Sequence, residues 1–181
     1  DLAEEKWNDA WMEYFQAKGF SCVKVNSKKG GGVKSIHAVI QEACKEKIER
    51  DRKRGILNRP VRAMVVGIPN VGKSTFINAL AGKACAKTGN KPGVTKGKQW
   101  IRLNRNVELL DTPGILWPKF EDQSVGMKLA FIGSIKDELL QRTELAAEFV
   151  KFMQRHYPGV LAEKYETSEE GEAYADLEGI A

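Results

Sequence analysis

The sequence is poor in the features that build disulfide frameworks, zinc sites and membrane spans. Its three cysteines, Cys22, Cys44 and Cys85, are widely spaced, and no Cys-x-x-Cys pair occurs. This pattern argues against disulfides and zinc, and we expect three small, mostly buried hydrophobes. No apolar run approaches the roughly 20 residues of a membrane span, and residues 1–5 lack a signal peptide's basic and apolar layout. The sequence therefore predicts a cytoplasmic protein with no membrane partner.

Charge of both signs is present but unevenly placed. Of 181 residues, 29% are charged and 42% are hydrophobic, which is ordinary for one globular domain with a modest extension. Basic residues are concentrated in the segment 45–62, whereas the segment 163–178 is strongly acidic. A basic run can bind the phosphates of a nucleic acid, but acidic residues interleaved at helical spacing also fit a solvated helix face. Charge alone leaves both interpretations open.

A complete phosphate-binding loop, Gly-x-x-x-x-Gly-Lys-Ser, occupies residues 67–74. Gly67 and Gly72 let backbone N–H groups turn toward phosphates, Lys73 reaches the β- and γ-phosphate oxygens, and Ser74 offers a hydroxyl to Mg²⁺. A predicted strand enters the loop and a predicted helix leaves it, as this motif requires. The residues that we expect to bind the nucleotide here are Pro69, Asn70, Val71, Gly72, Lys73, Ser74 and Thr75.

The sequence Asp111-Thr112-Pro113-Gly114 follows at the distance of a switch loop and predicts a GTPase. Asp111 is expected to reach Mg²⁺ through water, and the Gly114 amide to bond the γ-phosphate. Thr95, in the exposed loop over residues 87–97, is expected to complete the Mg²⁺ shell with Ser74 and Asp111. We therefore assign transition-state and switch roles to Lys73, Thr95 and Gly114.

Two expected GTPase features are missing. Ile115 follows Gly114 where a Gln would orient the attacking water, so the isolated domain should hydrolyse GTP slowly and need an external group or ion. No Asn-Lys-x-Asp motif for guanine occurs anywhere in the sequence. A circular order of motifs, with the base-recognition elements ahead of the phosphate-binding loop, would explain this second absence.

Two upstream segments fit such a circular order. The loop over residues 26–32, which begins Asn26-Ser27-Lys28, resembles the loop whose backbone contacts the guanine base. Asp1 resembles the end of a cut Asn-Lys-x-Asp motif. Both segments have plainer interpretations, since the loop can be an ordinary glycine turn and Asp1 merely a ragged start of the chain.

Hydrophobic periodicity predicts the remaining elements. The aromatic stripe of residues 4–18 predicts a helix that packs in the core. We further expect strands over 21–25, 61–66, 99–103 and 107–110, and helices over 33–54, 75–81, from 123 onward and over 137–154. One or two small helices are expected in residues 160–181.

These motifs, together with longer matches over residues 67–78, 86–89, 92–95, 99–100 and 109–122, resemble the circularly permuted GTPases. Within that class the chain resembles the bacterial ribosome biogenesis GTPase A family, also called YlqF. The resemblance implies an α/β, three-layer P-loop GTPase fold with circularly permuted motif order and a C-terminal helical extension. It divides the chain into a GTPase domain over residues 1–122, without its N-terminal part, and part of a helical RNA-binding region over 123–181.

The same resemblance implies a function and its requirements. The family binds and hydrolyses GTP to GDP with Mg²⁺, and assembles the large (50S) ribosomal subunit through ribosomal RNA and proteins. It is slow alone and stimulated by the particle. Asn70 resembles the residue that ligates K⁺ in cation-dependent relatives, and a monomer is expected off the ribosome. The family's N-terminal segment is absent, so we expect the sequence to be a fragment.

Two alternatives from other functional classes remain open on the sequence. One is a P-loop enzyme that transfers phosphate to a small molecule, which would need an acceptor pocket and usually a lid with Arg residues. The other is a nucleotide-independent RNA-binding module with a purely structural phosphate-binding loop. The intact set of Lys73, Ser74, Thr95 and Asp111 argues against the second alternative, because structure alone would not require all four.

Overall fold

A computed structural model describes residues 4–89 and 92–165, and these form two compact units. The first unit holds residues 4–67, 71–89 and 93–114, and the second holds 68–70, Pro92 and 115–165. Each unit is described by itself. The expected division into a GTPase domain over 1–122 and an RNA-binding region over 123–181 stays a prediction.

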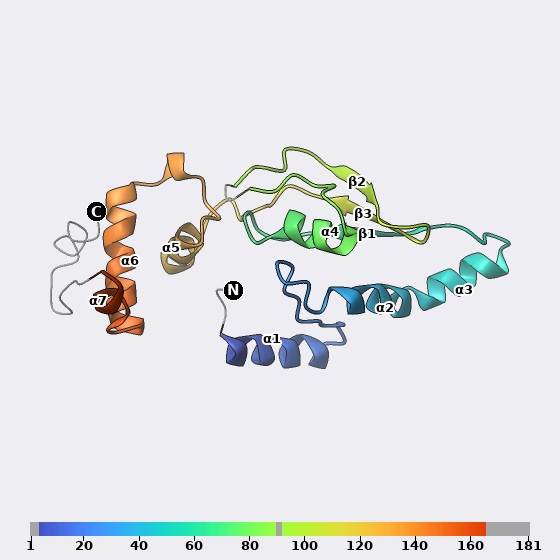
Figure 1. Cartoon of the computed structure of the whole chain (residues 1–181), viewed down its shortest axis with the longest axis horizontal. Helices are drawn as coiled ribbons and strands as arrows, with labels where there is room; N and C mark the ends of the chain where they lie inside the picture. Colours follow the sequence, from blue (N-terminus) through green and yellow to red (C-terminus); the bar gives the residue numbers. More distant parts are fainter. Residues whose placement is uncertain (1–3, 90–91, 166–181) are drawn as a thin grey trace. The chain divides into compact units, whose positions relative to one another are not determined.

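The first unit is built on a three-stranded sheet (Figure 1). Its strands are β1 (Val61–Val65), β2 (Gln99–Arg102) and β3 (Val107–Asp111), in the order β1-β3-β2. β1 pairs parallel to β3, and β2 pairs antiparallel to it. Val65 and Gln99 both lie opposite Asp111. The phosphate-binding loop, which follows β1, therefore starts at the same end of the sheet as Asp111, the last residue of β3.

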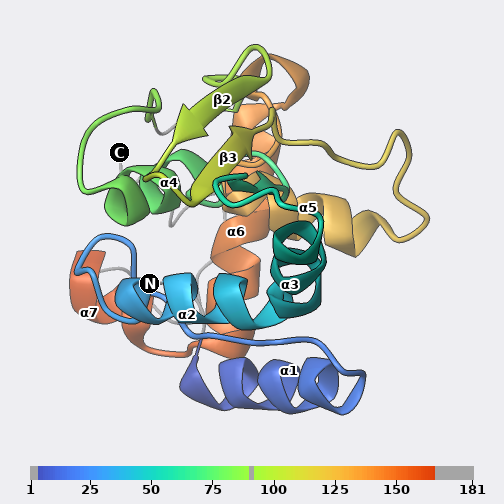
Figure 2. The same ribbon diagram turned by 90° about the vertical axis from the view of Figure 1, so that its right-hand side faces the viewer.

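One face of this sheet carries the core. Helix α4 (Lys73–Ala81) lies along the sheet and α2 (Val33–Ala43) lies beyond it (Figures 1 and 2). Ile77 and Leu109 are almost wholly buried at 0% and 2% exposure. On the other face Met64 and Trp100 are 60% and 52% exposed. The sheet is therefore covered by helices on the face where the apolar residues of β1 and β3 alternate inward.

The N-terminal aromatic stripe does not pack in the core as predicted. Helix α1 (Glu5–Ala17) contains no buried residue, and Trp7 and Trp11 are each 58% exposed. The aromatic rings instead contact one another, as where Trp11 stacks on Phe15 with centroids 5.8 Å apart. Lys24 pairs with Glu5 and Asp9 of the helix. Periodicity identified the helix correctly, but it could not identify what covers the apolar face.

Three other predicted elements differ from the structure. Residues 21–25 form no strand, and only an isolated bridge joins Asn26 to Gly31. The long helix over 33–54 is interrupted at Cys44, where φ is −105° and ψ is 7°, so α3 (Lys45–Lys53) is separate from α2. The helix expected from residue 137 begins five residues later as α6 (Arg142–His156), after the 3₁₀ turn η1 (Asp137–Leu139). The apolar residues of 137–141 fit a helical spacing in the sequence, but in the structure they lie in a turn.

The second unit is helical. Helix α5 (Gln123–Phe131) begins with the Asp122 carboxylate accepting a hydrogen bond from the Ser124 N–H at 2.8 Å. Ala147 and Val150 of α6 are buried against Leu161 of α7 (Val160–Tyr165). No helix in the described part of the chain is long and apolar enough to span a membrane. The three cysteines are free, and each is half-buried where the sequence predicted mostly buried side chains.

Asn78 of α4 holds the chain that leaves this helix. Its Oδ1 accepts the N–H groups of Cys85 at 2.9 Å and Ala86 at 2.8 Å, and its Nδ2 donates to the Ala86 carbonyl at 2.9 Å. We expect Asn78→Ala to lower the free energy of unfolding by about 2–3 kcal/mol, because these half-buried groups lose their partners.

Asn104→Ala is the matched control for this prediction. Asn104 also accepts two backbone N–H groups, from Asn106 at 2.8 Å and Val107 at 3.0 Å, but its side chain lies in an exposed turn that water reaches. Its loss should be less than about 1 kcal/mol. Urea unfolding of both variants checks this, and equal losses would contradict the role of Asn78.

Candidate functional site

The phosphate-binding loop presents backbone donors at the start of α4. Gly72 caps this helix with φ of 92°, and the Phe76 N–H bonds the Gly72 carbonyl at 2.8 Å. The cap provides no side-chain hydrogen bond, so the N–H groups of the first turn remain for an anion. Asn70 is the one non-glycine residue with a positive φ, 58°, in the described part of the chain. Asparagine tolerates this left-handed conformation better than most residues.

Lys73 lies over the loop that it is expected to serve. Its Nζ donates to the Gly67 carbonyl at 3.1 Å. Partial burial lowers the pKa of the Lys73 amino group from its ordinary value, and the Asp111 carboxylate opposes this shift. A desolvated cation beside backbone donors is suited to a phosphate, because a bound anion offsets the cost of its burial.

Three side chains with oxygen atoms that can ligate a metal lie close together at the predicted Mg²⁺ position. Ser74 Oγ lies 3.3 Å from Thr95 Oγ1 and donates to Asp111 Oδ2 at 3.5 Å. Asp111 is 1% exposed, and its Oδ1 is a buried atom without a hydrogen-bond partner among the described residues. A buried carboxylate oxygen in this condition is costly unless a ligand satisfies it. The hydroxyl and carboxylate oxygens are those that Mg²⁺ prefers, so the residues present fit this ion.

Thr112 fixes the position of Asp111 and has no role in the sequence-based prediction. It is 7% exposed, and its hydroxyl donates to the Val65 carbonyl at 2.7 Å. This bond joins the end of β3 to the end of β1 directly before the phosphate-binding loop. The sequence shows a threonine directly after the aspartate that ends the strand, but it does not show that the hydroxyl bonds a carbonyl 47 positions away.

Residues 68–70 are held within the second unit by the turn after α5. The Ser134 hydroxyl, in a residue 1% exposed, donates to the Pro69 carbonyl at 2.8 Å. Asn70 Nδ2 donates to the Ile132 carbonyl at 3.4 Å, and its Oδ1 accepts no hydrogen bond from the described residues. No motif or spacing in the sequence connects Ser134 with the phosphate-binding loop.

The roles of the other predicted site residues stay predictions. Val71 is 49% exposed, while Thr75 on α4 and Gly114 after β3 are half-buried. Ile115 is 76% exposed, so its apolar side chain is free of the core and has no group that bonds water. Asp1 lies outside the described residues.

The loop over residues 26–32 is a closed turn. The Asn26 N–H bonds the Gly31 carbonyl at 2.9 Å, and the Lys29 N–H bonds Asn26 Oδ1 at 3.0 Å. Val25 and Val33, on either side of the loop, pack in the same core as Ile77 of α4. The half-buried Asn26 and Ser27 and the exposed Lys28 therefore sit in a turn anchored on the same core as the helix of the phosphate-binding loop.

Gly32 allows this turn to close. A Cβ there would lie 2.1 Å from the Lys24 carbonyl oxygen, whereas at Gly30 a Cβ would have open space. Both residues have positive φ, 74° and 76°, so alanine costs about 1–2 kcal/mol of conformational energy at either. We expect Gly32→Ala to destabilise the protein by at least about 1 kcal/mol more than Gly30→Ala, because a backbone atom must also move.

Thermal unfolding of the two alanine variants measures this difference. The shared positive φ cancels in the comparison, which isolates the contact with Lys24. Equal unfolding temperatures would show that the turn relaxes without cost and that Gly32 is not required for its shape.

Comparison with known proteins gives consistent matches. Residues 62–170 match the family model described as 50S ribosome-binding GTPase. Ribosome biogenesis GTPase A of Bacillus cereus is 48% identical over 98% of this chain, and that of Priestia megaterium is 45% identical over the same share. The chain spans 60% and 62% of the length of these two relatives.

A solved structure gives the same result for the fold. A GDP-bound structure of TM YlqF matches with a TM-score of 0.57 and 25% identity, over 99% of this chain and 71% of that one. The predicted P-loop GTPase fold is confirmed, and the predicted circular permutation fits the match to YlqF.

Proposed function

We propose a function for this chain from one premise: it belongs to the 50S ribosome-binding GTPase family. The chain binds GTP, hydrolyses it to GDP and phosphate, and serves in assembly of the large ribosomal subunit. Family membership favours this function over transfer of phosphate to a small molecule and over RNA binding without a nucleotide.

The observation that carries the proposal is the buried Asp111 carboxylate beside Ser74 and Thr95, whose Oδ1 has no hydrogen-bond partner in the described part of the chain. A structural role would not require a desolvated carboxylate oxygen without a partner. Ser74, Thr95 and Asp111 would hold Mg²⁺, which when bound neutralises the charge that develops on the β- and γ-phosphates. The chain's own contribution is to place these oxygens next to the first turn of α4.

The remaining groups bind and orient the nucleotide. The N–H groups of α4's first turn and Lys73 Nζ bind the phosphates, and the Gly114 amide bonds the γ-phosphate. Thr95, in a loop, reports whether the γ-phosphate is present. The turn that begins at Asn26 contacts the guanine base.

Slow intrinsic hydrolysis follows from Ile115. An exposed isoleucine cannot orient the attacking water, so the chain needs an external group, and the large ribosomal subunit provides or completes it. The Asn70 Oδ1 atom is the K⁺ ligand in this scheme. Regulation by the ribosomal subunit therefore depends on the missing side chain that would orient the attacking water.

Phosphate release from GTP, with and without purified large ribosomal subunits, tests the proposal. We expect a slow rate in Mg²⁺ that rises strongly with subunits. In Ser74→Ala the Mg²⁺ concentration for half-maximal hydrolysis should rise at least about tenfold, because the ion loses a direct ligand.

Ser124→Ala is the control for this measurement. It removes a hydroxyl from an exposed residue in the first turn of α5, which belongs to the second unit and contributes none of the three oxygens, and should keep the wild-type Mg²⁺ dependence. A wild-type rate indifferent to subunits would remove the proposed partner. A Ser74→Ala variant with unchanged Mg²⁺ dependence would remove the proposed metal site.

The role of Asn70 is tested by the ratio of hydrolysis rates in K⁺ and Na⁺. Wild type should be faster in K⁺, and Asn70→Gly should bring the ratio close to one, because it removes Oδ1. Glycine tolerates the φ of 58°, so the variant avoids backbone strain. A variant that keeps the wild-type ratio would show that Asn70 does not ligate the ion.

A further inference from the structure

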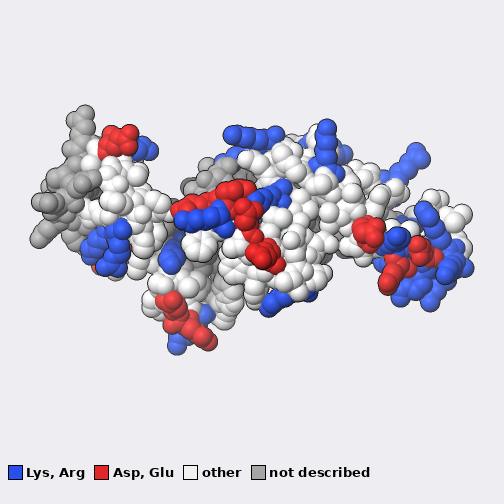
Figure 3. Space-filling model, turned by 90° about the horizontal axis from the view of Figure 1, so that it is seen from below, with Lys and Arg blue, Asp and Glu red and all other residues white. Residues whose placement is uncertain are grey.

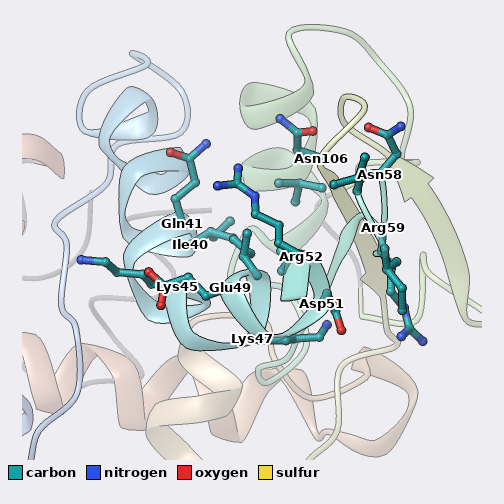
Figure 4. A pocket seen from close by; sticks show the side chains of 15 residues that line it. Ile40, Gln41, Lys45, Lys47, Glu49, Asp51, Arg52, Asn58, Arg59 and Asn106 are labelled. Carbon is teal, nitrogen blue, oxygen red and sulfur yellow. The ribbon is translucent and has the colours of Figure 1, made fainter. Parts of the chain in front are cut away.

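A cavity lies in the first unit, and no residue of the phosphate-binding loop lines it. It has a volume of about 390 Å³, within the range of roughly 300–1,000 Å³ that ligand pockets occupy. Its walls come from α2, α3, the segment 56–59 that leads into β1, and the turn between β2 and β3 (Figure 4). We propose that this cavity binds one unpaired nucleotide of RNA, with the base inside and the phosphates at the rim.

The floor of the cavity is apolar. Val61 and Val107, paired across β1 and β3, are 7% and 3% exposed. Ile40 and Ile48, from α2 and α3, complete the floor and are half-buried. Such a surface suits the flat face of a base, which loses little by leaving water, and it does not suit a bare phosphate.

Three amide side chains surround this floor: Gln41, Asn58 and Asn106. None of the three forms a side-chain hydrogen bond to another described residue. Each offers a donor and an acceptor side by side, which is the pairing that reads the edge of a base. Three unpaired amides around an apolar floor therefore favour a nucleobase over other apolar ligands.

The rim is basic. Lys47, Arg52 and Arg59 line the cavity, and among the described residues none of them forms a salt bridge. Figure 4 shows these three side chains extending to different sides of the cavity. Residues 45–62 contain eight basic and three acidic residues, and Figure 3 shows Lys and Arg atoms around α3 with a smaller number of acidic atoms among them. This charge complements the phosphates on either side of a bound nucleotide.

Two acidic residues, Glu49 and Asp51, also line the cavity. Their carboxylates repel a phosphate but accept hydrogen bonds from the exocyclic amino group of a base. They also disfavour an acidic peptide as the occupant. The cavity thus combines an apolar floor, amides and carboxylates inside it, and cations at the rim. This combination matches a nucleotide better than a bare phosphate or an acidic peptide.

The inference deepens the proposed function and rests on it, because a 50S ribosome-binding GTPase meets RNA on its target. It adds the class of RNA feature, an unpaired nucleotide, and the residues that bind it. The base face, the base edge and the phosphates are each matched by a different set of side chains. These sets can be changed separately.

The test measures binding of the full chain to a labelled single-stranded RNA of about 12 nucleotides, and to a blunt duplex of the same length. We expect the single strand to bind more tightly. Asn58→Ala with Asn106→Ala should weaken single-strand binding about tenfold, because base-edge contacts are lost, with the salt dependence unchanged. Both side chains are exposed, so the unfolding temperature should stay at the wild-type value.

The basic rim is tested in the same assay. Arg52→Ala with Arg59→Ala should weaken binding and reduce the slope of log affinity against log salt by about 1 to 1.5, because two phosphate contacts are lost. Lys34→Ala with Lys83→Ala is the charge-matched control, since both lysines are exposed and neither lines the cavity. The control should show no such change.

Three outcomes would overturn the inference. They are equal losses in the rim and control variants, an unchanged affinity in the amide variant, and displacement of the RNA by polyglutamate at equal charge. Hydrolysis separates this inference from the proposed function. Subunits that stimulate wild type while the amide variant keeps its RNA affinity would refute the cavity alone. Subunits without effect on wild type would refute the proposed function, whatever the oligonucleotides show.

Discussion

The parallel pairing of β1 with β3 is the constraint on which the candidate site depends. It sets Val65 opposite Asp111, so the chain enters the phosphate-binding loop beside the carboxylate that the site requires. The Thr112 hydroxyl closes this edge by bonding the Val65 carbonyl at 2.7 Å. Ser74 then reaches Asp111 from the first turn of α4. A slip in this register would separate the loop from the carboxylate and remove the oxygen cluster.

The cost of the arrangement is concentrated at two groups. Asp111 Oδ1 is buried without a partner among the described residues, and Lys73 carries a pKa lowered by partial burial. Both conditions disfavour the folded state when no ligand is bound. Both are relieved by the same kind of ligand, a phosphate with its divalent cation. Strain of this kind concentrates at functional sites, where binding offsets it.

The two proposed sites lie at opposite ends of β1. The RNA cavity takes Val61 at the start of this strand and Arg59 just before it. The phosphate-binding loop begins shortly after the strand ends at Val65. A strand of five residues extends about 17 Å, at about 3.4 Å per residue. One rigid element thus carries the nucleotide site at one end and a candidate RNA contact at the other.

Local spacing determined the chemistry. The phosphate-binding loop and the Asp-Thr-Pro-Gly sequence name most residues of the site, because each motif is a short run whose backbone shape depends on its own residues. The same holds for β1, β2, β3 and α4, where periodicity and turn residues agree. Local signals failed where the outcome depended on a distant partner. The segment over 21–25 has the composition of a strand but pairs with none, and the helix expected through Cys44 breaks there.

The sequence by itself therefore determined the motifs, the order of the main elements and the class of nucleotide chemistry. Only the tertiary structure decided which apolar faces are covered, as the exposed Trp7 and Trp11 show. It also decided that Asp111 is buried with one oxygen unpaired among residues 4–89 and 92–165, and that Ser134 bonds Pro69. The reason is that conformation over a few residues follows from their own sterics and hydrogen bonds. Burial and pairing instead depend on segments that are far apart in the chain.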